Sequence, residues 1–313
     1  MSRAFVFPGQ GAQTIGMGKA LAEAYPAARA VFDEVDEALG ERLSALVWEG
    51  EQDQLTLTQN AQPALMATSL AAMRALEAEG VTIDAAAMVA GHSLGEYSAL
   101  AAAGALSLAD CARLLRIRGE AMQKAVPVGV GAMAAVLGLD LEAVRALAAD
   151  AAEGEVCEAA NDNDPGQVVV SGQRAAVERA VAMAKERGAK RAMLLPVSAP
   201  FHCALMQPAA DAMAEALSAV TISAPRVPLV ANVVAEQVHD PDRIRALLVE
   251  QVTGAVRWRE SVLYMAAQGV TETWEIGAGK ALSGMVRRID RDVETRAVGT
   301  PEDVAAAVAA LNG

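Results

Sequence analysis

The chain has 313 residues, of which 53% are hydrophobic and 21% charged, and its formal net charge is −13. This acidic balance and an aromatic content of only 3% argue against a nucleic-acid-binding protein, which needs a basic face to release counterions. An anionic membrane surface is disfavoured for the same reason. The apolar fraction excludes a disordered chain, so a globular protein of about two domains, or one large domain with an insertion, is expected.

The cysteines and the amino terminus indicate where the protein works. Cys111, Cys157 and Cys203 are odd in number and lack Cys-x-x-Cys spacing, so neither a disulfide framework nor a zinc site is predicted, and a reducing cytoplasm fits best. The first apolar stretch is interrupted by Pro-Gly at 8–9, too early for a signal peptide. No apolar run approaches the ~20 residues of a membrane span. We therefore expect a cytoplasmic protein.

The first 120 residues predict alternating strands and helices. Strands are predicted at 4–7 and 85–90, and helices at 17–39, 63–76 and 96–103. The first of these helices is expected to kink at Pro26, and Pro63 is placed at the first position of the second helix, where its missing N–H costs nothing. This repetition favours a parallel sheet covered on both faces.

The middle of the chain has a different pattern. Strands are predicted at 132–137, 155–160, 167–171 and 191–195, helices at 141–152 and 175–187, and a turn at 161–166. The order β-α-β-β-α-β is the split βαβ pattern of ferredoxin-like domains. We therefore predict a small inserted domain at 127–197, within a discontinuous α/β core made of 1–126 and 198–313.

The alternation of strands and helices resumes after Pro200. Strands are predicted at 227–231, 273–276 and 295–298, and helices at 203–217, 244–251, 261–267, 282–289 and 304–311. The overall fold class is therefore α/β, with a parallel-sheet core and a smaller inserted domain.

Gly-His-Ser-Leu-Gly at 91–95 is a Gly-x-Ser-x-Gly motif between a predicted strand and a predicted helix. This context is typical of the strained turn that lifts a serine Oγ clear of a sheet. Glycines suit such a turn because it needs positive φ and close backbone approach. Ser93 is therefore a candidate nucleophile, and the alternative is a glycine-rich turn with an incidental serine.

A serine nucleophile needs an adjacent base, and the chain has three histidines. His92 neighbours the serine in sequence, so its side chain is expected to point away from Oγ. His239 lies in His-Asp-Pro-Asp, which predicts an exposed turn. His202 is by elimination the best candidate base, against the alternative of a packed or capping side chain.

The loop Phe-Pro-Gly-Gln-Gly-Ala-Gln at 7–13 follows the first strand. An oxyanion hole needs two N–H donors, one from the residue after the nucleophile, here Leu94, and one from an early strand-to-helix loop. The loop around Gln10 is well placed for the second donor. It lacks the Gly-Lys-[Ser/Thr] ending of a phosphate-binding loop, and an ordinary turn is the alternative.

Three arginines, Arg113, Arg116 and Arg118, lie on the next predicted helix among apolar neighbours. Helical spacing places Arg118 on a different face from Arg116. Most helical arginines are solvated or paired, whereas a buried one would offer a bidentate fork to a carboxylate. Spacing alone leaves both interpretations open.

Five separated motifs together resemble one family. They are Phe-Pro-Gly-Gln-Gly at 7–11, Gly-His-Ser-Leu-Gly-Glu-Tyr at 91–97, Arg-Gly at 118–119, Asn-Asp-Pro-Gly-Gln at 163–167 and His-Cys-Ala-Leu-Met at 202–206. In this order, over almost the whole chain, they resemble the malonyl-CoA:acyl carrier protein transacylases of bacterial fatty-acid synthesis. The resemblance implies an α/β-hydrolase-like core with a ferredoxin-like insertion, in agreement with the order of elements above.

The resemblance also implies a role for several residues. Ser93 would accept the acyl group with His202 as its base, and the backbone amides of Gln10 and Leu94 would hold the oxyanion. It implies a ping-pong reaction through a malonyl-serine ester, with no metal and no cofactor, because coenzyme A enters only as part of the thioester substrate.

Two further positions follow from the resemblance. Arg118 would pair with the free carboxylate of malonate. Gln251 would orient the base through its main-chain carbonyl, which would explain why no acidic residue stands out as the third member of a triad.

Malonyl-CoA and an acyl carrier protein are the partners implied, and no nucleic acid or membrane is expected. Because carrier proteins are acidic, docking needs a local basic patch on this acidic chain. Lys190 and Arg191 are the first candidates for it, and Arg287 and Arg288 are the second.

Two alternatives to acyl transfer stay open. A serine hydrolase or thioesterase would use the same Ser93–His202 pair, release the acyl group to water and have no need of Arg118. A non-catalytic scaffold would keep the fold without activity, although the retained Ser93, His202 and Arg118 weigh against it. Whether the carrier serves fatty-acid or polyketide synthesis is not decided by these residues.

Overall fold

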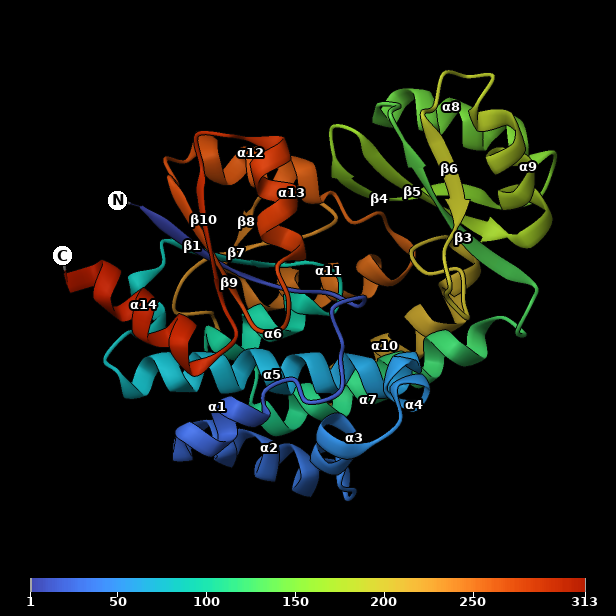
Figure 1. Cartoon of the computed structure of the whole chain (residues 1–313). Coiled ribbons are helices and arrows are strands. Elements are labelled where there is room, and N and C mark those ends of the chain that lie inside the picture. Colours follow the sequence, from blue (N-terminus) through green and yellow to red (C-terminus); the bar gives the residue numbers. More distant parts are fainter. Residues whose placement is uncertain (1, 313) are drawn as a thin grey trace.

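The computed structural model describes residues 2–312, which form two separate sheets and their covering helices (Figure 1). The larger sheet has the strand order β10-β9-β1-β2-β7-β8. Its strands are β1 (Arg3–Phe7), β2 (Met88–Gly91), β7 (Leu229–Val230), β8 (Gln237–Val238), β9 (Glu272–Ile276) and β10 (Glu294–Val298). All pairings are parallel except β7 with β8, so the predicted parallel core is confirmed.

Helices cover both faces of this sheet. Successive residues of a strand point to opposite sides, and because both sides are apolar here, both need a covering layer. Phe5 and Phe7 of β1 join the apolar cluster of one face, and Ala4 and Val6 join that of the other. The first face is covered by α1 (Lys19–Ala24), α2 (Pro26–Leu39), α3 (Leu43–Glu49), α4 (Gln52–Thr56), α5 (Thr58–Ala78), α6 (Gly95–Ala102), α7 (Leu108–Ala125), α10 (Gln207–Ser218), α11 (Pro241–Thr253) and α14 (Pro301–Asn312). The second is covered by α12 (Trp258–Ala267) and α13 (Ala281–Ile289).

The smaller sheet is antiparallel, with the order β4-β5-β3-β6. Its strands are β3 (Gly131–Leu137), β4 (Cys157–Asp164), β5 (Gln167–Gln173) and β6 (Arg191–Leu194), and α8 (Leu141–Ala152) and α9 (Arg174–Ala184) pack against it with a core of their own. In Figure 1 this unit, in green and yellow, stands beside the main sheet. The predicted β-α-β-β-α-β order is confirmed, and the domain boundaries at 127 and 197 stay a prediction.

The predicted turn at 161–166 is wrong. Strand β4 continues through Asp164 with two irregularities in its register, which leaves only Pro165 and Gly166 to turn. The polar side chains there have partners on the main sheet's side: Asp162 pairs with Arg259 at 2.8 Å and Asp164 with Arg288 at 2.7 Å. Tertiary ion pairs and backbone bonds thus outweigh the turn propensity of Asn and Asp.

Two predictions about prolines also need correction. The helix expected over 17–39 is broken rather than kinked, because Tyr25 adopts an extended conformation and Pro26 begins α2. Pro63 lies inside α5 rather than at its start. Proline cannot donate to the carbonyl four residues earlier, and here Arg116 Nη1 donates to that Gln59 oxygen at 2.7 Å instead.

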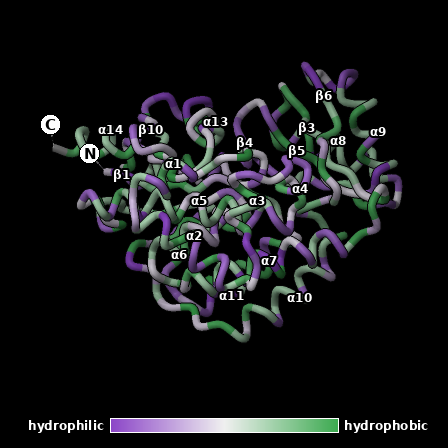
Figure 2. Tube along the Cα trace, turned by 60° about the horizontal axis from the view of Figure 1, so that its bottom comes forward, coloured by the Kyte–Doolittle hydropathy of each residue, from purple (hydrophilic) through white to green (hydrophobic). Residues whose placement is uncertain are grey.

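Figure 2 shows hydrophilic and hydrophobic stretches following each other along the trace, as expected of amphipathic elements. Within residues 2–312, no helix is long and apolar enough to cross a membrane.

Candidate active site

Ser93 lies at the sharp turn between β2 and α6, with a positive φ of 54°. The flanking glycines are required by contact: a Cβ on Gly91 would lie 1.9 Å from the Gly95 carbonyl carbon, and one on Gly95 would lie 2.2 Å from the Phe7 oxygen. The motif therefore packs the turn against the end of β1. This strained conformation is typical of an exposed nucleophile at the end of a strand.

His202 meets Ser93 across 109 residues of sequence. The Ser93 Oγ lies 2.8 Å from His202 Nε2. On the other side of the ring, Nδ1 lies 2.9 Å from the Gln251 carbonyl oxygen and 3.2 Å from that of Gly254. Because carbonyls only accept hydrogen bonds, Nδ1 carries the proton and Nε2 is left to accept one from the serine.

The His202 imidazole is neutral at neutral pH. Burial in the protein, and next the positive charge of Arg118, lower its pKa to about 3. The His202 backbone has a positive φ of 58° and the residue is 4% exposed, so its position is fixed by the surrounding chain. A neutral imidazole can accept the Ser93 proton while Ser93 Oγ forms a bond to an acyl carbon.

Arg118 is the buried cation of the site, with 1% of its surface exposed. Its Nη2 donates to Ser93 Oγ at 3.1 Å and to Gln251 Oε1 at 2.8 Å, and its Nη1 donates to Gln62 Oε1 at 2.7 Å. The next residue, Gly119, lets α7 approach α5, since a Cβ there would lie 2.5 Å from Gln59 Cα. The guanidinium has five N–H groups, so part of its fork stays available to a carboxylate.

The other two arginines of α7 serve elsewhere. Arg113 is exposed and pairs with Asp110 at 3.3 Å, whereas Arg116 pairs with Glu41 and the start of α5. The predicted separation of Arg116 from Arg118 is confirmed.

The loop around Gln10 lies against the serine turn. A Cβ on Gly9 would lie 2.7 Å from the His92 carbonyl oxygen, so glycine is required for this approach. Among residues 2–312, the backbone N–H groups of Gln10 and Leu94 have no hydrogen-bond acceptor, and both residues line the cavity beside Ser93. Two such donors beside a nucleophile can hold an oxyanion.

The remaining histidines do not contact Ser93 Oγ, in agreement with the sequence. His92 bonds through Nε2 to Asn163 Oδ1 at 2.8 Å, and burial lowers its pKa. His239 is exposed ahead of α11. His202 is therefore the histidine that the fold brings to the serine.

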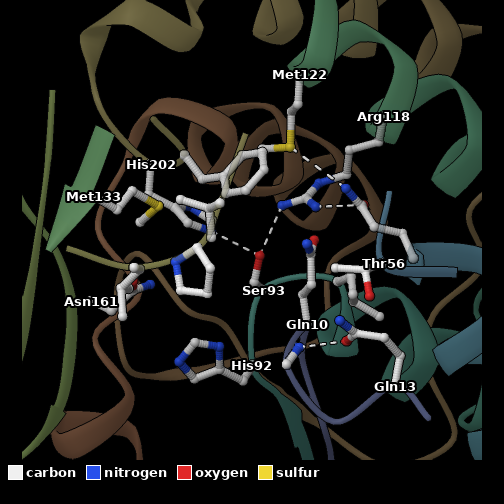
Figure 3. A pocket seen from close by; sticks show the side chains of 17 residues that line it. Gln10, Gln13, Thr56, His92, Ser93, Arg118, Met122, Met133, Asn161 and His202 are labelled. Carbon is white, nitrogen blue, oxygen red and sulfur yellow. Dashed lines mark hydrogen bonds between the residues drawn. The ribbon is translucent and has the colours of Figure 1, made fainter. Parts of the chain in front are cut away.

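Ser93, His202 and Arg118 line a cavity of about 430 Å³ between the two sheets (Figure 3). Ser93 and Arg118 come from the core, and Met133, Asn161 and Leu195 come from the side of the smaller sheet. Most of its surface is apolar, and the polar groups of Ser93, Arg118 and His202 converge on it, as is usual for a small-molecule site.

Three polar residues of the site were not found from the sequence. Asn232 accepts from Ser93 N–H at 2.8 Å and donates to the Gly91 oxygen at 2.7 Å, which braces the turn. Gln62 Oε1 accepts a hydrogen bond from Arg118 at 2.7 Å, and Glu96 Oε2 accepts one from Gln251 Nε2 at 3.0 Å. Glu96 follows the serine motif directly, which was a usable signal, whereas Asn232 and Gln62 stand in no recognisable motif.

In the described part of the chain, no group of three or more His, Cys, Asp or Glu side chains is arranged to hold a metal ion. The three cysteines are buried and unpaired.

Known proteins resemble this chain over its full length. The family model described as "Acyl transferase domain" matches residues 4–301. Proteins named malonyl CoA-acyl carrier protein transacylase are 50% identical in Bacillus subtilis, covering 98% of this chain and 96% of theirs, and 49% identical in Escherichia coli, covering 97% and 98%.

Solved structures agree with these relatives. An acyl-carrier-protein-S-malonyltransferase from Bartonella henselae superposes with a TM-score of 0.98 at 57% identity, covering 100% of both chains. A malonyl-transacylase in complex with a type II PKS acyl-carrier protein superposes with a TM-score of 0.96 at 42% identity, covering 99% of this chain and all of that one. The chain therefore belongs to the acyl transferase domain family and, within it, to the malonyl CoA-acyl carrier protein transacylases.

Proposed function

We infer that this protein moves a malonyl group from malonyl-CoA to the phosphopantetheine thiol of an acyl carrier protein, for fatty-acid or polyketide synthesis. The observation that carries this inference is the buried Arg118 guanidinium, 3.1 Å from the Ser93 oxygen. A short acyl group attached to Ser93 could therefore bring a terminal carboxylate against this guanidinium. The relatives are named for the same transfer.

In the first half-reaction we propose that Ser93 Oγ attacks the thioester carbonyl of malonyl-CoA. The serine proton passes to His202 Nε2, and the developing oxyanion is held by the amides of Gln10 and Leu94. Collapse of the tetrahedral intermediate breaks the carbon–sulfur bond, and His202 returns the proton to the departing thiolate. The products are coenzyme A and a malonyl-serine ester.

The second half-reaction reverses these roles. The carrier thiol gives its proton to His202 and attacks the ester carbonyl at the same oxyanion hole. When the carbon–oxygen bond breaks, His202 protonates Ser93 Oγ, so the enzyme returns to its starting state. The Gln251 carbonyl keeps the imidazole in the tautomer that both halves need. The proposal assigns no step to a metal or a cofactor.

Arg118 would select acyl groups that end in a carboxylate. Burial makes such an ion pair specific, because an uncharged acyl end would leave the guanidinium without its partner in a low-dielectric site. The serine-hydrolase alternative gives no role to this arginine, and nothing in the comparisons favours it.

Carrier docking is proposed near Lys190 and Arg191, both exposed. Arg191 begins β6 and lies roughly 13 Å along the strand from the cavity-lining Leu195, at ~3.3 Å per residue, and Lys190 precedes it. The second candidate is α13. Its Arg288 binds Asp164 at the end of β4, the strand that also carries the cavity-lining Asn161.

The buried, unpaired cysteines support the predicted cytoplasmic location.

Intact-mass measurement tests the transfer. Incubation with malonyl-CoA alone is expected to give a stable adduct of one malonyl group, absent in Ser93→Ala and discharged by a carrier protein bearing the phosphopantetheine thiol. Rapid release of free malonate without carrier would instead establish a hydrolase. Absence of both an adduct and released malonate would establish a non-catalytic protein.

A further inference from the structure

Glu96 is a buried carboxylate that the proposed reaction does not use. It is 1% exposed and lies in the first turn of α6, three residues after the serine. One oxygen, Oε2, accepts from the Asn232 backbone N–H and from Gln251 Nε2, each at 3.0 Å. A buried carboxylate is costly unless its surroundings compensate it, so its position calls for an explanation.

The Gln251 side chain connects Glu96 to Arg118. Its Nε2 faces Glu96 Oε2 and the Ser93 carbonyl oxygen, both at 3.0 Å, while its Oε1 accepts from Arg118 Nη2 at 2.8 Å. The opposite orientation of the amide would bring oxygen against those two acceptors and N–H against the guanidinium. The amide is therefore held in one orientation, and Glu96 supplies the charged acceptor that favours it.

Glu96, Gln251 and Arg118 form a relay of two hydrogen bonds that run in the same direction. Arg118 donates to the Gln251 oxygen, and the Gln251 nitrogen donates to the Glu96 carboxylate. A carboxylate that accepts from one end of an amide makes the oxygen at the other end a stronger acceptor. That oxygen fixes Nη2, the nitrogen that also donates to Ser93 Oγ. The relay thus acts on the part of the guanidinium nearest the reacting oxygen.

We propose that Glu96 is a positioning residue for acyl-group selection, which holds the Arg118 fork in place for a terminal carboxylate through the Gln251 side-chain amide. The proposal rests on the transfer of malonyl groups inferred above. A carboxylate-bearing acyl group needs a fixed guanidinium, whereas an acetyl group makes no contact with it. Loss of Glu96 therefore lowers acylation by malonyl-CoA more than acylation by acetyl-CoA.

Two variants at this position separate charge from hydrogen bonding. Because both donors share one oxygen, Glu96→Gln keeps both hydrogen bonds and removes the charge, whereas Glu96→Met removes both bonds. Above pH 8, where Glu96 is charged despite its raised pKa of about 7, we expect the malonyl/acetyl ratio of single-turnover Ser93 acylation rates to fall about threefold in Glu96→Gln and about tenfold in Glu96→Met. The tenfold loss is the size of one charge-assisted hydrogen bond. Glu96→Gln keeps the test valid should Glu96→Met fail to fold.

Glu275→Gln is the matched control. Glu275 is a fully buried carboxylate that accepts from the backbone N–H groups of Leu282 and Ser283 at the start of α13. Its neutralisation is expected to leave the malonyl/acetyl ratio unchanged. A general loss of packing would lower both acylation rates by the same factor, and that result in Glu96→Gln and Glu96→Met would overturn the proposal.

A double-mutant cycle tests the route through the amide. Gln251→Met removes the relay but keeps the main-chain carbonyl that His202 uses. In that background Glu96→Gln is expected to leave the ratio unchanged, because the connection to Arg118 is already lost. An undiminished effect of Glu96→Gln would overturn the proposed route. Failure of the wild-type protein to form any malonyl adduct would instead overturn the proposed function.

Discussion

We propose that the charge and burial of Arg118 set both the acyl selectivity and the pH response of the site. The guanidinium lies beside Ser93 Oγ, and its charge is the second cause, after burial, of the lowered His202 pKa. One side chain therefore influences the substrate and the base together. Each effect predicts a separate change when the charge is removed.

Arg118→Ala is expected to keep an acylatable serine but to lose the preference for malonyl over acetyl thioesters. The reason is that the carboxylate of malonate then enters the site without a cation. Adduct formation with each thioester, measured by intact mass over time, checks the prediction. Arg113→Ala, an exposed position on the same helix, is the control, and unchanged selectivity in Arg118→Ala contradicts the assignment.

The same variant is expected to shift the pH dependence of acylation. Removing a neighbouring positive charge favours the protonated imidazole, so the His202 pKa rises from its value of about 3. The acid limb of the acylation rate moves to higher pH, whereas burial, the larger cause, keeps the pKa below that of an exposed histidine. Single-turnover rates with acetyl-CoA between pH 4 and 8 test this: the variant is expected to lose rate at the acid end of the range, and a profile as flat as that of the wild type would refute the prediction.

Among the elements, α7 positions Arg118 in the site and also supplies a hydrogen-bond donor that the neighbouring helix α5 lacks. Pro63 leaves the Gln59 carbonyl without its helical donor, and Arg116 supplies one at 2.7 Å. Gly119 brings the two helices close enough for both contacts. The start of α5 also carries Gln62, which binds Arg118, so this junction supports the site.

Arg116→Met is expected to destabilise the fold by about 1–3 kcal/mol, because hydrogen bonds from a charged donor are lost and the part-buried Gln59 carbonyl is left without a partner. Part of that loss should disappear in a Pro63→Ala background, because alanine restores the helical N–H. Chemical denaturation of the wild type, both single variants and the double variant gives the coupling energy. Strictly additive effects would show that Arg116 does not compensate for the proline.

At the scale of the whole molecule, the net charge of −13 opposes the approach of an acidic carrier protein, so docking depends on local cations. Lys190→Glu/Arg191→Glu is expected to raise the KM for the carrier about tenfold at low salt, with the KM for malonyl-CoA unchanged. Arg29→Glu/Arg243→Glu is a control with the same change of charge on other surfaces. An unaltered carrier KM rejects this site, and a rise in Arg287→Glu alone would move docking to α13.

Folding stability is also expected to depend on pH through Glu96. Burial raises its pKa from 4.5 to about 7, so the folded state binds a proton that the unfolded state has released. This contribution is fully present below pH 4.5 and is lost as pH rises towards 7. His202 acts in the opposite direction, since its lowered pKa costs stability as pH falls below 6.5.

The difference in Tm between the wild type and Glu96→Gln isolates the carboxyl group from the other titrating residues. The free energy of unfolding of the wild type is expected to fall relative to that of Glu96→Gln as pH rises from 4.5 to 7, by up to about 1.4 kcal/mol per pH unit, and the Tm difference follows it. Thermal melts across this range measure it, with Glu275→Gln as control. A difference that does not vary with pH contradicts the raised pKa of Glu96.

Local sequence patterns were enough to predict the order of elements and to select Ser93 and His202 as the candidate reacting pair. Local patterns carry this information: Gly91 and Gly95 are fixed by backbone contact at one turn, and three histidines left His202 by elimination. The parallel core and the small antiparallel sheet followed from the periodicity and order of strands and helices, because these reflect which faces are buried.

The surroundings of that pair depend on contacts between elements that are distant in sequence. Residues 161–164 continue a strand because Arg259 and Arg288, distant in sequence, bind their carboxylates, and Pro63 lies within a helix because Arg116 supplies the missing donor. The relay from Glu96 to Arg118 likewise joins side chains from separate helices. Such contacts depend on how elements pack, and no local propensity encodes which distant polar group will satisfy a buried one.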